Sequence, residues 1–231
     1  MAQFDLATVL TDEFRGWLLK GFLVSIELTA ITWLIAVPLA TFTALCRLSS
    51  VTAARWLGFV LVEGIRNIPL LVHLLFWYFA VPELLPEAVR AWLYEHNAEF
   101  VCAVGALTLY TAAFMAEDIR SGIRAVPVTQ LEAARALGFS FLASMRRIVL
   151  PQAVRIIVPP LISQSLNLWK NTSVATVIGA AELMYQAQRV ETASFRGVET
   201  FTVVTLAYLC ISLLITALAS WFQRQFPVRT A

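Results

Sequence analysis

Residues 201–222 read FTVVTLAYLCISLLITALASWF and contain no charged side chain. A helix of roughly 20 apolar residues crosses the hydrocarbon core of a bilayer, which is about 30 Å thick. Two stretches nearer the N-terminus are similar, since residues 100–116 contain no charge and residues 22–45 contain only Glu27. These stretches predict an all-α integral membrane protein, because a helix satisfies its own backbone polar groups in lipid.

The composition of the whole chain supports this prediction. Of its 231 residues, 59% are hydrophobic and 14% are charged, and the mean hydropathy is +0.75. A soluble domain usually carries about a quarter charged residues. We therefore expect a single transmembrane domain over residues 1–231, with five spanning helices at about residues 18–46, 57–81, 100–121, 153–176 and 200–223.

The charges between these expected helices predict the orientation of the chain. Five spans would place alternate connecting segments on opposite sides of the membrane. One set of segments holds five Lys or Arg and ten acidic residues, and consists of residues 1–20, 82–99 and 177–199. The other set holds ten Lys or Arg and three acidic residues, and consists of residues 47–56, 117–155 and 222–231. Because basic segments stay in the cytoplasm during insertion, we expect the N-terminus outside and the C-terminus in the cytosol.

The long segment of about residues 122–152 is expected to form two short helices on the cytoplasmic side. Thr129 and Glu132 have the spacing of a capping box, which predicts a helix start. Apolar residues then repeat at helical spacing up to Gly138, and they are Leu131, Ala134 and Leu137. A second stretch has an apolar side made of Phe141, Met145 and Ile148. Periodicity alone leaves two alternatives open, a pair of helices on the lipid surface and a pair covered by a partner protein.

The residue pattern of this segment favours the second alternative, in which a partner protein covers the two helices. Glu132-Ala133-Ala134, Gly138 and Ile148-x-Leu150-Pro151 match every position of the pattern EAA-x3-G-x9-I-x-L-P. The segment resembles the EAA loop of binding-protein-dependent ABC importers, whose permeases have the type I fold. The resemblance implies a coupling helix that inserts into a groove of a separate ATPase subunit. The residues to which it gives this coupling role are Glu132, Ala133, Ala134, Ala136, Leu137, Gly138, Phe141, Ile148, Leu150 and Pro151.

The residue types of this coupling loop fit such a role. The alanines leave little side chain and allow a close approach to a partner. Gly138 permits a turn that a side chain would strain. Glu132 has two possible roles, to cap its own helix or to pair with a basic group of the partner, and its spacing from Thr129 favours the cap.

The resemblance extends to the polar amino acid permeases. Residues 66–72 (RNIPLLV) and 168–175 (LWKNTSVA) resemble segments of that group, and His73 departs from it, because the family usually has Gln there. The glutamate/aspartate permeases are the most similar, judged on Trp77-Tyr78 and residues 82–87 and 155–160. The resemblance implies a multi-pass protein of the bacterial inner membrane. Its implied partners are two ATPase subunits, a second permease that is a copy or a paralogue, an extracytoplasmic binding protein and an amino acid.

Polar residues at membrane depth are the candidates for the solute path, because burying them in lipid is costly. They are Arg66, Asn67, Gln164, Asn167, Lys170, Asn171, Thr172 and Ser173. Structural alternatives stay open for the two charged members. Arg66 can pair with Glu63 three residues earlier and lock the helix, and Lys170 can extend toward the membrane interface. His73 is expected to be a satisfied interhelical donor.

No nucleotide-binding or hydrolytic motif occurs in the sequence, neither GxxxxGK[ST] nor GxSxG nor HExxH. We therefore expect a transport subunit that is not an enzyme, with no catalytic residue, no metal and no cofactor of its own. ATP and Mg would be bound by the partner ATPase, and lipid is an expected neighbour whereas nucleic acid is not. Alternatives within the class are glutamine or a broad range of polar amino acids as substrate. An ion-coupled secondary carrier would usually show internal repeats, and a membrane enzyme would show a reactive constellation.

Overall fold

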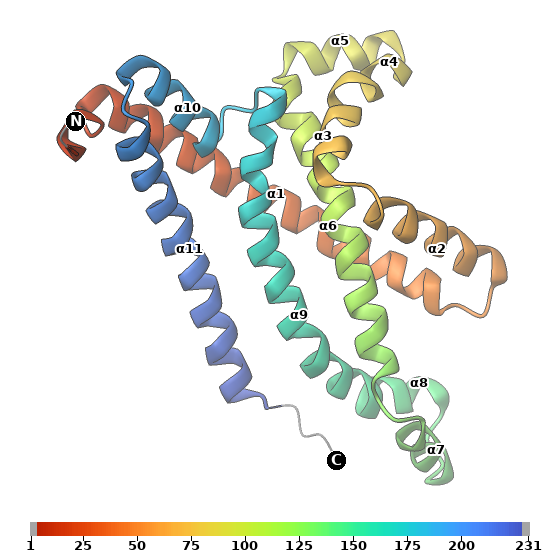
Figure 1. Ribbon diagram of the computed structural model, residues 1–231. Helices are drawn as coiled ribbons and strands as arrows, with labels where there is room; N and C mark the ends of the chain where they lie inside the picture. Colours follow the sequence, from red (N-terminus) through yellow and green to blue (C-terminus); the bar gives the residue numbers. More distant parts are fainter. Residues whose placement is uncertain (1–3, 228–231) are drawn as a thin grey trace.

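The computed structural model describes residues 4–227, and every regular element in that range is a helix (Figure 1). In chain order they are η1 (Leu6–Thr8), α1 (Asp12–Leu48), α2 (Thr52–Arg66), α3 (Leu70–Phe79), α4 (Val81–Leu84), α5 (Glu87–Glu95), α6 (Ala98–Arg124), α7 (Val128–Ala136), α8 (Phe141–Ser144), η2 (Met145–Val149), α9 (Leu150–Asn171), η3 (Thr172–Ile178), α10 (Leu183–Ser194) and α11 (Gly197–Gln225). η1 and η3 are 3₁₀-helices, and η2 is a turn of π-helix. Arg229, counted among the cytoplasmic arginines, lies outside the described residues.

Three long helices carry the membrane-spanning character of the described chain. α1, α6 and α11 are long and apolar enough to cross a bilayer, and α2 with α3 would make a fourth span as a bent pair. α1, α6 and α11 confirm the helices predicted at 18–46, 100–121 and 200–223, and each extends beyond both predicted ends. α9 has the length of a span, but it is not apolar enough to be counted with the others. The count of five spans therefore stays a prediction.

The continuous helix predicted over residues 57–81 is wrong. α2 ends at Arg66, α3 begins at Leu70, and the helix direction bends by 103° between them. Pro69 explains the break, because it has no backbone N–H to donate and disfavours helical geometry in the preceding residue. The side chain of Asn67 stabilises the end of α2 by donating to the carbonyl of Glu63 at 2.7 Å. The bend turns α2 away from α3 and toward the end of α1 (Figure 1).

The helix predicted over residues 153–176 also differs in its boundaries. α9 starts at Leu150, with Pro151 in its first turn, and continues through Pro159 and Pro160. After Asn171 the α-helix gives way to the 3₁₀-helix η3, which ends at Ile178. The next residue, Gly179, has a φ of +85°. Upstream, η2 joins α8 directly to α9. α8, η2 and α9 thus form one uninterrupted helical path.

α6 is the centre of the packing, and small residues allow its neighbours to approach closely. It contacts α1, α2, α3 and α9, and its buried residues include Ala103, Ala106, Ala113 and Ala116. A Cβ on Gly105 would lie 2.2 Å from the ring of Trp77 on α3. Helices in membranes commonly associate through such small residues, because packing between them replaces the hydrophobic effect.

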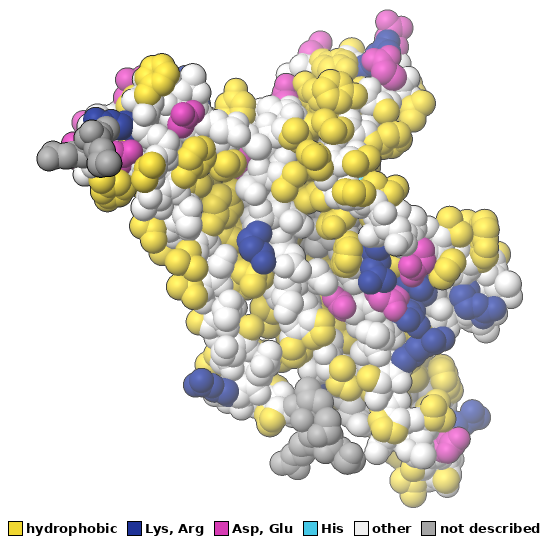
Figure 2. Space-filling view, in the orientation of Figure 1, with side chains coloured by type: hydrophobic (Ala, Val, Ile, Leu, Met, Phe, Trp, Pro, Cys, Tyr) yellow, Lys and Arg dark blue, Asp and Glu magenta, His cyan; other side chains and the backbone are white. Residues whose placement is uncertain are grey.

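The segments with acidic character gather at one end of the molecule. α4, α5, α10 and the beginning of α1 lie at the top of Figure 1, whereas α7, α8 and the end of α11 lie at the bottom. Figure 2 shows acidic side chains at the top beside α4 and α5, and apolar side chains over much of the face between the two ends. This separation agrees with the two-sided arrangement that the loop charges predict.

Glu182 joins three helices at the end that holds α10, and no pattern in the sequence points to it. Its carboxylate accepts from the backbone N–H groups of Met184 and Tyr185, each at 2.9 Å, and so caps α10. It also accepts from the hydroxyl of Tyr208 on α11 at 2.9 Å and from that of Ser25 on α1 at 3.3 Å. The side chain is fully buried. Four donors therefore compensate this carboxylate for its loss of water.

The Glu182→Gln variant is expected to change how the stability of the protein depends on pH. Burial raises the pKa of Glu182 from its ordinary 4.5 to about 7, against the effect of its four donors. Its stabilising contribution is therefore fully present below a pH of about 4.5 and is lost as the pH rises through about 7. Thermal unfolding in detergent should show the wild type losing stability relative to the variant over this range, by at most about 1.4 kcal/mol per pH unit. Parallel curves would contradict this.

Candidate functional site

The first half of the coupling loop is the exposed helix α7. It begins after Pro127, and Glu132, Ala133 and Ala136 are exposed on its surface. Leu137, which ends it, is 78% exposed. Ala134 differs, because it is buried within the chain itself. The expected close approach to a partner is therefore open to Ala133 and Ala136 and closed to Ala134.

Gly138 provides the turn after α7. Its φ is +86°, in the left-handed region that side chains disfavour. Its N–H donates to the carbonyl of Arg135 at 3.0 Å, and the N–H of Phe139 donates to the carbonyl of Ala134 at 3.1 Å. These two bonds make a Schellman motif, which satisfies carbonyls at the end of the helix. The prediction of a turn that needs glycine is confirmed.

The predicted capping role of Glu132 is wrong. The residue before α7 is Pro127, and no side chain accepts a hydrogen bond at this helix start. The physical reason is the position of the start, which lies ahead of Thr129 and so puts the expected cap inside the helix. The carboxylate of Glu132 has neither a hydrogen bond nor an ion pair with the described residues, and the residue is exposed. Its carboxylate is thus available to a basic group of a partner.

The second half of the coupling loop is rigidly connected to α9. Ser140 caps α8 by accepting from the N–H of Ala143 at 3.3 Å. Phe141 and Leu150 are exposed, as is Pro151, while Ile148 is half-buried. Val149 is buried and belongs to a core cluster that also contains residues of α6. A force on α8 would therefore pass through η2 into α9, because no flexible segment separates them.

A polar pocket of about 360 Å³ lies between α6 and α9. α6 contributes Tyr110, Thr111 and Phe114. α9 contributes three polar residues that the sequence singled out, namely Gln164, Asn167 and Asn171, together with Leu168. The spacing of these residues along α9 puts them on one helix face. The structure therefore brings three of the eight predicted path residues together in one cavity.

The other candidates on α9 and η3 do not line this α6–α9 pocket. Lys170, next to Asn171 in the chain, is exposed, and its ammonium group has no hydrogen bond or ion pair with any described residue. The hydroxyl of Thr172 is buried and donates to the carbonyl of Trp169 at 2.8 Å, and that of Ser173 donates to the carbonyl of Lys170 at 2.7 Å. Both hydroxyls are thus used within their own helix, which the sequence could not reveal.

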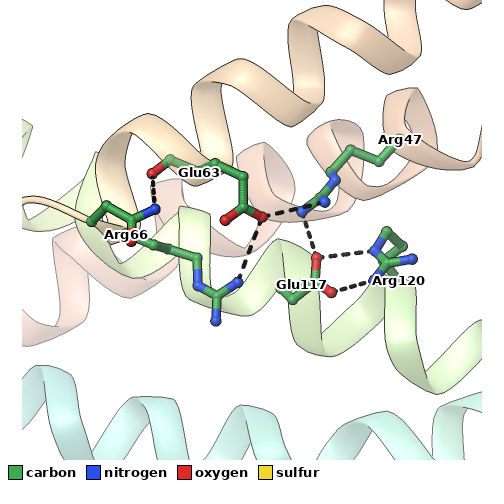
Figure 3. A network of polar contacts seen from close by, with 6 residues as sticks. Arg47, Glu63, Arg66, Glu117 and Arg120 are labelled. Carbon is green, nitrogen blue, oxygen red and sulfur yellow. Dashed lines mark hydrogen bonds and ion pairs between the residues drawn. The ribbon is translucent and has the colours of Figure 1, made fainter.

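Arg66 belongs to a network of charges, so its structural alternative is supported (Figure 3). Its guanidinium lies 3.9 Å from Glu63 and 5.1 Å from the ring of Phe114, a pocket residue. Arg47 on α1 pairs with Glu63 at 3.5 Å and also with Glu117 on α6. Arg120 pairs with Glu117 as well, through its Nε at 2.9 Å. The network ties α1, α2 and α6 together.

His73 is confirmed as a satisfied interhelical group. It is 8% exposed, and its Nε2 lies 3.2 Å from the carbonyl oxygen of Ile65, on the far side of the bend between α2 and α3. Its ring makes an edge contact with that of Tyr110, which lines the pocket. The residue therefore supports the wall of the cavity from outside.

The all-helical fold with membrane-spanning helices, the polar cavity and the exposed loop of two short helices fit a membrane transport subunit. Residues 36–230 match the family described as binding-protein-dependent transport system inner membrane component. The chain belongs to this family. It is an inner-membrane permease subunit of a polar amino acid ABC importer. Permease subunits of such importers lack an ATPase site of their own and act with ATPase and permease partners.

Several proteins of this family are similar over nearly the whole chain. The glutamate/aspartate import permease protein GltJ of Escherichia coli is 35% identical over 216 residues, which cover 92% of this chain and 88% of GltJ. The probable glutamine ABC transporter permease protein GlnM of Bacillus subtilis is 35% identical over 218 residues, with 94% and 96% covered. A crystal structure of an amino acid ABC transporter with histidines matches with a TM-score of 0.85 and 29% identity, covering 97% of this chain and 100% of that one.

Proposed function

We propose that this permease translocates an acidic amino acid, glutamate or aspartate, by alternating access driven by a separate ATPase. The observation that carries the proposal is the path from the coupling loop to the pocket. α8, η2 and α9 are continuous, and α9 supplies Gln164, Asn167 and Asn171 to the cavity. One rigid helix thus connects the surface that would meet the ATPase with the surface that would meet the solute.

In this mechanism α7 docks in a groove of the ATPase through its exposed residues. Leu137 and Phe141 supply apolar area that needs covering, and Glu132 is available for a basic group of the partner. When the ATPase subunits close, the loop moves and α9 shifts against α6. The pocket between those helices then opens alternately to the two sides. ATP and Mg bind to the partner ATPase, and this chain transmits the resulting motion from the coupling loop to the pocket.

The substrate assignment rests on the likeness to the glutamate/aspartate permeases and on the charge beside the pocket. Lys170 is an exposed cation without a described partner, on the helix that lines the cavity. A cation at membrane depth is favourable where it meets an anion. Glutamine is the second candidate, because the chain is 35% identical to a probable glutamine permease as well.

The remaining parts of the proposed assembly follow from the family. Two ATPase subunits would engage two coupling loops, so the importer would contain a second permease, either a copy of this chain or a paralogue. A binding protein would deliver the amino acid from outside. The end that holds α10 and α5 would face the binding protein, and the arginine-rich end with α7 would face the cytosol.

The Lys170→Gln variant is expected to lower the uptake of acidic amino acids about fivefold to tenfold, because a partly solvated charge pair contributes roughly 1 kcal/mol. Uptake of radiolabelled L-glutamate and L-glutamine into cells measures it. The matched control is Lys20→Gln, an exposed lysine near the start of α1. Unchanged glutamate uptake in Lys170→Gln would remove this residue from the path, and wild-type uptake of glutamine in preference to glutamate would favour the second candidate.

A further inference from the structure

Asp118 is an acidic residue on α6 that the arginine network leaves out. The two other acids of this region, Glu63 and Glu117, both pair with arginines. Asp118 makes no ion pair among the described residues, and its carboxylate accepts one hydrogen bond, from Nε2 of Gln164 at 2.9 Å. An acid held in this way at membrane depth is a candidate for a functional role.

The bond to Asp118 fixes which way the Gln164 amide points. An ionised carboxylate is an acceptor only, so the amide must offer its NH₂ group to Asp118. The carbonyl Oε1 then faces away from the acid, and there Nδ2 of Asn167 lies 3.4 Å from it. The two hydrogen bonds therefore form a series from Asn167 through Gln164 to Asp118, in which each amide donates toward the acid. Gln164 and Asn167 both line the α6–α9 pocket.

This order leaves the carbonyl oxygens of both amides with free acceptor capacity, and one N–H of each NH₂ group also stays unused. Oε1 of Gln164 has a second lone pair, and Oδ1 of Asn167 has no described partner. Both are acceptors, and an ammonium group is a donor only. We infer that Asp118 is a positioning residue, which sets the polarity of this wall so that the pocket accepts the α-ammonium of an amino acid. The inference rests on the proposed function, since it concerns the same pocket.

The alternative is that the bond only ties α6 to α9. The variant Asp118→Asn separates the two roles. An asparagine can accept from the Gln164 amide or donate to it, so the tie between the helices survives in either direction. The fixed orientation of the Gln164 amide does not survive in this variant, because that amide is free to turn its NH₂ group into the pocket. A mere tie predicts no change in ligand binding.

The test is equilibrium binding to the purified complex of the full chain with its partners in lipid nanodiscs, without binding protein. The probes are L-glutamate and L-glutamine, each compared with the analogue that lacks the ammonium, glutarate and glutaramate. D118N is expected to weaken binding of the amino acid about tenfold, the effect of one charge-assisted hydrogen bond. The analogues are expected to bind D118N and the wild type equally.

The exchange variant D118N/Q164E keeps one acid and one amide between the helices and returns acceptor oxygens to position 164. Its binding of the amino acid is expected to lie within about threefold of the wild type, because the polarity of the wall is restored. An unchanged D118N, an equal loss for amino acid and analogue, or an exchange variant as weak as D118N would each overturn the inference. A wild type that binds neither amino acid would instead remove the pocket from the proposed solute path, and the inference with it.

Discussion

The Gly138→Val variant is expected to lose at least about nine-tenths of amino acid uptake while the protein still inserts and folds. Gly138 has a φ of +86°, and a left-handed conformation costs an ordinary side chain roughly 1–2 kcal/mol, and a β-branched one more. The turn would rearrange, and α7 would leave the direction in which it meets the ATPase. The measurement is uptake by the reconstituted importer together with its ATPase rate.

A Cβ at position 138 would meet nothing within 4 Å. The effect of the substitution is therefore confined to the backbone and to the partner surface, and the transmembrane core is untouched. Gly138→Asn is the matched control, because asparagine tolerates the left-handed region best among residues with a side chain. It should retain most uptake. Full uptake in Gly138→Val at normal expression would contradict the coupling role of this turn.

The Glu117→Gln variant is expected to lower the thermal stability of the permease by roughly 3 kcal/mol, because it leaves the partly buried Arg120 without an acid and the buried Arg47 with Glu63 alone. Glu117 pairs with Arg47 on α1 and with Arg120 on its own helix, and the Arg47 side chain is only 9% exposed. A loss of this size corresponds to a fall in Tm of about 10 °C for a chain of this length. Thermal unfolding followed by size-exclusion chromatography in detergent measures it.

The control for this effect is Glu83→Gln. Glu83 pairs with Arg90 at 3.1 Å, but its side chain is 65% exposed. An ion pair in water contributes about 0–1 kcal/mol, so its loss should change Tm by no more than about 3 °C. Equal shifts in the two variants would contradict the view that the network in Figure 3 holds α1, α2 and α6 together.

Local sequence patterns predicted the features that depend on local chemistry. The uncharged stretches predicted α1, α6 and α11, because the length of an apolar run decides whether it can span a bilayer. Gly138 was predicted as a turn because glycine relieves a local backbone strain, and the helix stops there. The amides of α9 were likewise predicted as candidates for the solute path. Gln164, Asn167 and Asn171 line one pocket because they share a helix face.

Features that depend on contacts between distant residues were not predictable. Asp118 and Glu117 lie within the helix α6, and the predicted span of residues 100–121 also contained them, but nothing in the sequence indicated their partners. Their roles come from Gln164 and Arg47, which are distant in the chain. The break before Pro69 had a local signal in the proline itself. It was missed because the apolar residues on both sides favoured one continuous helix. Glu182 gave no signal, because its four donors come from three different helices.

The central claim is that this chain is a permease whose coupling loop engages a separate ATPase. Co-purification of the tagged full chain from its native membrane in mild detergent, followed by identification of what accompanies it, tests that claim most directly. An ATPase subunit and a second permease are expected to accompany the chain, and Gly138→Val is expected to reduce the amount of ATPase recovered whereas Gly138→Asn is not. A chain that is recovered alone and monomeric, with full solute transport after reconstitution by itself, would contradict the claim.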